Sequence, residues 1–163
     1  MKHIVQTIDF QEYLSSAELP GQDRELLETA RAATLTSYAP YSHYHVGAAV
    51  RLTGGQIVTG SNQENISFPA GLCAERVALF AAVSQFPGIA IEAIAISARA
   101  DNFDVTEPVP PCGMCRQAIA EYEMKFNKGI RIILGGETGK ALVIDNMEQL
   151  LPLMFREKGL VKP

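Results

Sequence analysis

Apolar and polar residues change their spacing several times along the chain, and these changes predict alternating helices and strands. Between residues 22 and 40 the apolar positions recur at helical period, and Pro40 ends the segment. One side of this predicted helix carries Leu26, Leu27, Ala30, Ala33 and Thr34. Further along, near-continuous or alternating apolar runs predict strands, interrupted by two more helical stretches. The predicted strands lie at 45–52, 56–61, 91–98, 130–136 and 141–146, and the two helices at 73–85 and 112–124.

The order of these segments predicts an α/β domain, with a mixed five-stranded sheet flanked by helices. A Thr-Gly-Gly turn joins the first two strands and predicts an antiparallel hairpin. We expect residues 22–163 to form a single domain, whose tail is helix-like and broken at Pro152. Residues 1–21 precede it as an extension of unknown role, with a strand near 3–8 and a short helix near 10–16.

The bulk composition narrows the class of protein. The chain has 163 residues, 47% hydrophobic and 20% charged, with a net charge of −4 and no run of Lys or Arg. Binding to nucleic acid or to an anionic membrane needs clustered cations, so both partners are unexpected. The first residues show no secretory signal pattern, and no apolar stretch is long enough for a bilayer. We therefore expect a soluble protein of the cytoplasm.

Three cysteines carry the candidate chemistry. Cys112 and Cys115 form a C-x-x-C pair at a predicted helix start, which fits a redox pair, half of a metal site, or two packed thiols. Cys73 begins the other helix, and a redox pair does not need it, whereas a metal site does. Three thiolates plus an open position is the layout of a catalytic zinc. The histidines offer no clear fourth ligand: His3, His43 and His45.

Charged residues beside the cysteines extend this interpretation. Glu75 follows Cys73 by two residues, so its carboxylate can serve an open metal position as an acid/base without ligating the metal. Compensation of the helix dipole is the simpler role of such a Glu. Arg76 is a candidate for withdrawing charge from thiolate sulfur, and Arg116 is a second candidate with an ordinary surface role as its alternative.

With "CAE" at 73–75 and "PCGMC" at 111–115, the chain resembles the zinc-dependent cytidine deaminases, in their small homotetrameric branch with three cysteine ligands. The resemblance covers roughly residues 24–156. It implies a three-layer α/β/α fold, one Zn²⁺ per chain on the three cysteines, and Glu75 as the acid/base. It also implies hydrolytic deamination of cytidine and 2′-deoxycytidine in pyrimidine salvage.

The same resemblance assigns substrate contacts. It places Tyr44 near the base, and puts Asn62 and Glu64 on the 3′-hydroxyl of the ribose. The backbone N–H of Ala74 is expected to orient the water or the ring carbonyl. Phe155 lies in a segment that reaches the active site of a neighbouring subunit, so the resemblance implies active sites shared within a homotetramer.

Three positions depart from the family pattern. Phe68 stands where Tyr is common, Pro110 where Ser or Thr is usual, and His43 where Lys is frequent. None is a zinc ligand or Glu75, so they bear on affinity more than on reaction type. Other functions stay open at this point: a related deaminase acting on another base or on blasticidin S, a non-catalytic zinc module, and a redox protein.

Overall fold

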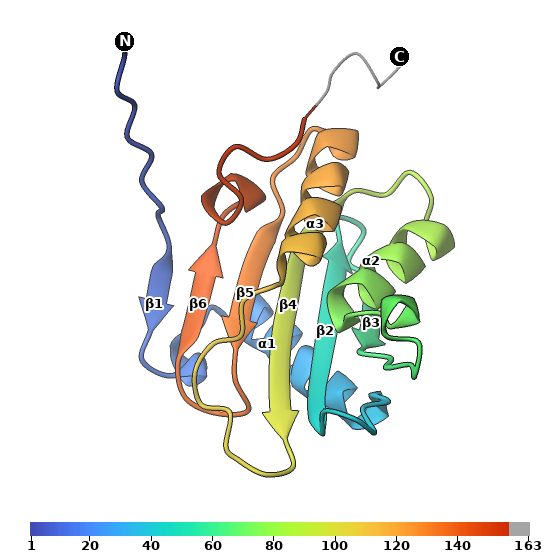
Figure 1. Cartoon of the computed structure of the whole chain (residues 1–163). Coiled ribbons are helices and arrows are strands. Elements are labelled where there is room, and N and C mark those ends of the chain that lie inside the picture. Colours follow the sequence, from blue (N-terminus) through green and yellow to red (C-terminus); the bar gives the residue numbers. More distant parts are fainter. Residues whose placement is uncertain (157–163) are drawn as a thin grey trace.

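The structure is a computed structural model that describes residues 1–156, which form one mixed sheet with helices on both faces (Figure 1). The strand order is β1-β6-β5-β4-β2-β3. The β4–β5 pair is parallel and the other neighbouring pairs are antiparallel. The strands are β1 (Gln11–Tyr13), β2 (Tyr44–Leu52), β3 (Ile57–Ser61), β4 (Ile91–Ala100), β5 (Arg131–Gly135) and β6 (Ala141–Ile144).

Helix α1 (Gly21–Ala33) covers one face of the sheet, and α2 (Ala74–Gln85) and α3 (Gly113–Phe126) cover the other (Figure 1). Because side chains alternate along a strand, each central strand feeds both cores. The α2/α3 core takes mainly large side chains from the strands: Val50, Leu52, Ile94, Ile96, Ile132 and Leu134. The α1 core takes mainly small ones: Ala49, Ala93, Ala95, Ile133, Ala141 and Val143. The three-layer α/β/α fold is confirmed.

Small side chains let α1 approach the sheet closely. A Cβ atom at Gly47 of β2 would lie 2.1 Å from the carbonyl oxygen of Ala30 in α1. The five residues expected on the inner side of this helix are all buried, from Leu26 to Thr34. The helical period of the sequence therefore identified the correct face of α1.

The sheet has six strands, so the prediction of five was wrong by one. The additional strand, β1, pairs with β6 at the edge of the sheet, and Tyr13 packs against the α1 core. It lies where a short helix was expected near 10–16, and residues 3–8 form no strand. A three-residue strand has no readable period, and its pairing with the other end of the chain outweighs local propensity.

The C-terminal tail also differs from its prediction. It contains only the 3₁₀ helix η4 (Met147–Gln149), followed by turns, because Pro152 cannot donate a helical hydrogen bond. The rest of the expected helix, residues 157–160, lies outside the described residues. Within residues 1–156, no helix combines the length and apolar character that a bilayer-spanning segment requires.

Candidate active site

The three cysteines meet at the N-terminal ends of α2 and α3. Cys73 immediately precedes α2, Cys112 immediately precedes α3, and Cys115 lies in the first turn of α3. The Sγ atoms of Cys73 and Cys112 are 3.9 Å apart, those of Cys112 and Cys115 are 3.5 Å apart, and all three lie within 4.8 Å. A tetrahedral zinc with Zn–S bonds of about 2.3 Å would separate its sulfurs by about 3.8 Å. The spacing of these thiols therefore fits one zinc ion.

The surroundings of Cys73 favour its thiolate. Hydrogen bonding to Cys115, together with Arg76 and Cys112, lowers the pKa of the Cys73 thiol to about 5, against the opposing effect of burial. Its place at the start of α2 adds the positive end of a helix dipole. Cys115 is buried, and its contact with Cys73 together with its burial raises the pKa of its thiol. Metal binding requires all three thiols to lose their protons, and the low pKa makes Cys73 the readiest to do so.

Glu75 lies in the first turn of α2 with only 4% of its surface exposed. Burial, assisted by the charge of Cys73, raises the pKa of its carboxyl group. The side chain lines the same pocket as Cys73 and Cys112. A buried carboxyl group with a raised pKa beside a metal site is suited to taking up and releasing a proton.

The two arginines differ in what they contact. Arg76 lies beside the sulfurs of Cys73 and Cys115. Burial alone would lower the pKa of its guanidinium, but hydrogen bonding to Cys73 and the charges of both sulfurs outweigh burial and raise that pKa. Arg116 instead donates from Nε to the carbonyl oxygen of Pro111 (2.8 Å) and from Nη1 to that of Leu150 (2.7 Å). The role of Arg76 in withdrawing charge from the sulfurs stays a prediction. Arg116 holds the loop before α3 against the C-terminal segment, and its role towards sulfur stays a prediction.

A pocket of about 860 Å³ opens over the thiols. The pocket contains both the metal-site residues and the residues predicted to bind substrate. Among the predicted site residues it is lined by Tyr44, Asn62, Glu64, Cys73, Glu75, Arg76 and Cys112, and among the departures by Phe68 and Pro110.

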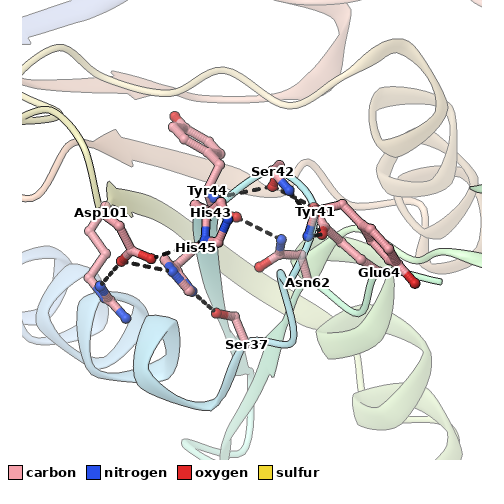
Figure 2. A network of polar contacts seen from close by, with 10 residues as sticks. Ser37, Tyr41, Ser42, His43, Tyr44, His45, Asn62, Glu64 and Asp101 are labelled. Carbon is pink, nitrogen blue, oxygen red and sulfur yellow. Dashed lines mark hydrogen bonds and ion pairs between the residues drawn. The ribbon is translucent and has the colours of Figure 1, made fainter. Parts of the chain in front are cut away.

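The polar wall of this pocket is fixed by hydrogen bonds to the backbone (Figure 2). Asn62 accepts from the N–H of Val46 (2.8 Å) and donates to the carbonyl oxygen of Tyr44 (2.9 Å). Glu64 accepts from the N–H groups of Tyr41 (2.9 Å) and Ser42 (3.3 Å) and from the Ser42 hydroxyl (2.5 Å). The hydrogen bond from Ser42 is the main cause that lowers the pKa of the Glu64 carboxyl group. Both side chains therefore have fixed orientations.

The remaining predicted residues occupy distinct places. The Tyr44 ring stacks on Phe103 with centroids 6.2 Å apart. Ala74 is the first residue of α2, which places its N–H at the helix start beside Cys73. Phe155 is 69% exposed and lies outside the set of residues that line the pocket. Its carbonyl oxygen accepts from Gln117 (3.3 Å).

Sequence reasoning missed Tyr41 and Ser42, which hold Glu64, and Phe103, which stacks on Tyr44. Two of the three contacts to Glu64 come from backbone N–H groups, which any residue provides. The sequence signal that could have indicated these contacts is the short polar segment after Pro40, because such segments form turns whose N–H groups are free to bind an anion.

An α/β/α protein with three clustered thiols at two helix starts, beside a buried carboxyl group in a pocket, belongs to the class of zinc enzymes that activate water. The family model "Cytidine and deoxycytidylate deaminase zinc-binding region" matches residues 20–127. The chain therefore belongs to the cytidine and deoxycytidylate deaminase family, and its cofactor is zinc.

Individual relatives agree with this assignment. The chain is 44% identical over 134 residues to a cytidine deaminase of Halalkalibacterium halodurans, covering 82% of this chain and 94% of that protein. A blasticidin-S deaminase of Bacillus cereus is 33% identical over 144 residues, covering 87% and 98%. The crystal structure of a cytidine deaminase from Burkholderia pseudomallei superimposes with a TM-score of 0.70 at 34% identity, covering 84% of this chain and all of that one.

Proposed function

We propose that this protein is a hydrolytic cytidine deaminase that converts cytidine and 2′-deoxycytidine to the uridine nucleosides. One observation carries the proposal: the three thiols and the buried Glu75 share a pocket with the oriented pair Asn62 and Glu64. The first group supplies the chemistry of a zinc deaminase, and the second supplies a place for a sugar. The relatives named cytidine deaminase support the same substrate class.

In the proposed reaction, Cys73, Cys112 and Cys115 hold the metal. Zinc held there would supply Lewis acidity, which would make water acidic enough to lose a proton at neutral pH. Glu75 takes a proton from the attacking water and delivers it to N3 of the base, so that C4 becomes more electrophilic. The water oxygen then bonds to C4. Glu75 takes the remaining proton of that oxygen and passes it to the amine, and the C4–N bond breaks to release ammonia and leave a carbonyl group at C4. The raised pKa of Glu75 suits a group that must hold the proton between these steps.

The neighbouring groups orient the reactants in this proposal. Arg76 withdraws negative charge from the sulfurs, which offsets the net charge that three thiolates place on Zn²⁺. The N–H of Ala74 orients the water or the ring carbonyl. The carbonyl oxygen of Pro110, a residue that lines the pocket, accepts from the amine of the base. Phe68 packs edge-on against Tyr41 at the pocket wall, with ring centroids 6.0 Å apart, and offers no hydroxyl there.

A substrate panel tests the proposal. Purified zinc-loaded protein is given cytidine, 2′-deoxycytidine, cytosine and blasticidin S, and both ammonia release and the loss of cytidine absorbance are followed. We expect turnover of the two nucleosides at comparable kcat/KM, because Asn62 and Glu64 are assigned to the 3′-hydroxyl and no residue is assigned to the 2′ position. Ammonia from blasticidin S but not from cytidine would replace the proposed substrate by the antibiotic.

We further propose a homotetramer in which Phe155 of one subunit completes the site of another. Phe155 supports this because it is largely exposed and lies away from the pocket of its own chain. An exposed aromatic side chain is more stable when it packs against a flat base or a partner surface. The tetramer would act in pyrimidine salvage in the cytoplasm, where a reducing environment keeps the three thiols free.

Mixing two inactive variants tests the shared site. Glu75→Ala and Phe155→Ala are each expected to be poorly active alone, and co-refolding them at equal ratio should restore about a quarter of wild-type activity. The gain arises because some mixed sites receive Glu75 from one subunit and Phe155 from another. The two variants mixed without co-refolding provide the control. Activity of the co-refolded sample equal to the mean of the two variants would show that each chain uses its own Phe155.

A further inference from the structure

The turn that precedes β2 encloses the carboxylate of Glu64 (Figure 2). Oε2 accepts from the consecutive N–H groups of Tyr41 and Ser42, at 2.9 and 3.3 Å. Oε1 accepts from the Ser42 hydroxyl at 2.5 Å. Consecutive backbone N–H groups in a turn form an anion-binding nest, and here the anion is a side chain of the same protein.

The turn is itself held in shape. The N–H of His43 donates to the carbonyl oxygen of Ala39 (3.1 Å), and His43 has a positive φ of 55°. The Ser42 hydroxyl also accepts from the N–H of Tyr44 (3.1 Å) while it donates to Glu64. Its proton is therefore committed to Glu64, and the hydroxyl has one orientation that satisfies both neighbours.

The Glu64 carboxylate can accept only about one more hydrogen bond. A carboxylate offers about four lone-pair positions, and the chain occupies three of them. The fourth is on Oε1, the oxygen that Ser42 holds. Beside it, Asn62 has its oxygen on Val46 and one N–H on Tyr44, which leaves one N–H unused. Among the described residues, this wall therefore keeps an acceptor position on Glu64 and a donor N–H on Asn62, besides the second lone pair of the Asn62 oxygen. A single hydroxyl group can donate to the Glu64 oxygen and accept from the Asn62 N–H.

We propose that Ser42 is a positioning residue that makes this pocket selective for a free 3′-hydroxyl. By fixing Oε1, it aligns the free acceptor of Glu64 with the free donor of Asn62. The inference rests on the proposed function and adds a residue to it. It also implies that a 3′-phosphate is rejected, because the phosphate brings negative charge and no proton to an acceptor that is already ionised.

Ser42→Ala tests the inference on cytidine and 3′-deoxycytidine. We expect KM for cytidine to rise about tenfold with kcat within about twofold, as for a lost hydrogen bond to a charged group. Kinetics with 3′-deoxycytidine should not change, so the discrimination between the two substrates should fall by the same factor. Ser42→Thr, which keeps the hydroxyl, should restore the discrimination.

Ser37→Ala is the matched control. Ser37 lies in the same segment and contacts His45 through its hydroxyl, but it does not contact Glu64 or line the pocket (Figure 2). We expect wild-type discrimination from this variant. Equal losses on both substrates in Ser42→Ala, or discrimination equal to that of Ser37→Ala, would overturn the inference and leave the proposed function intact.

A second measurement does not depend on turnover. Titration of the Glu64 carboxyl carbon by NMR should show a lowered pKa in the wild type that rises towards its ordinary value in Ser42→Ala. If the pKa of Glu64 in Ser42→Ala equalled that of the wild type, the proposal that the Ser42 hydroxyl fixes Glu64 would be contradicted, even if cytidine proved not to be the substrate. Failure of the wild type to deaminate cytidine, with a normal response in this titration, would overturn the proposed function alone.

Discussion

Glu75→Gln should retain one zinc per chain and lose about a thousandfold or more in kcat, since a positioned acid/base contributes roughly 10² to 10⁴ in rate. Glutamine fills the buried position without leaving a cavity and cannot carry a proton. Glu75→Ala should behave in the same way, with some loss of stability. The measurement combines steady-state kinetics on cytidine, zinc content by elemental analysis and thermal unfolding.

The expected pattern separates a catalytic role from a structural one. A folded, zinc-loaded Glu75→Gln protein with turnover near that of the wild type would show that Glu75 serves only the dipole of α2. Glu121→Gln on α3 is a suitable control, because that side chain is exposed and lies outside the pocket. It should change kcat by less than about twofold, as expected of a surface substitution.

The layers of the fold could be predicted because the spacing of apolar residues changes clearly between helical and strand segments. The segment from Leu26 to Thr34 is buried along the predicted side, and both cysteine-bearing helices begin within one residue of their expected positions. The sixth strand could not be predicted. Gln11–Tyr13 is polar and short, and it becomes a strand only because the edge of β6 offers hydrogen-bonding partners.

The cysteines and the acid/base candidate of the site were more predictable than the hydrogen bonds of its polar wall. Thiols and a carboxylate at helix starts are rare enough to be read from their spacing, and the structure brings Cys73, Cys112 and Cys115 together. The hydrogen bonds that hold Glu64 could not be predicted, because two of them come from backbone N–H groups of a turn that is distant from Glu64 in the sequence. Arg116 was ambiguous for the opposite reason, since an arginine beside a cysteine can equally well bind carbonyl oxygens, and here it does.

Removal of zinc should abolish deamination and lower the temperature of unfolding. The three sulfurs lie within 4.8 Å of one another at the starts of α2 and α3, so a bound metal links the two helices. Removing the metal breaks this link and removes the stabilisation that metal binding gives to the folded state. We expect residual activity of less than about a hundredth after exhaustive chelation, because the metal is the group assigned to lower the pKa of the attacking water.

Add-back identifies the nature of the site. Zn²⁺ should restore both activity and stability, whereas Mg²⁺ should restore neither, because it prefers oxygen ligands in octahedral geometry. Cys112→Ser, at the most exposed of the three thiols, should weaken zinc binding and show the same losses without a chelator. Full activity in protein shown by elemental analysis to contain less than about a hundredth of an equivalent of metal would contradict a catalytic metal at the three thiols.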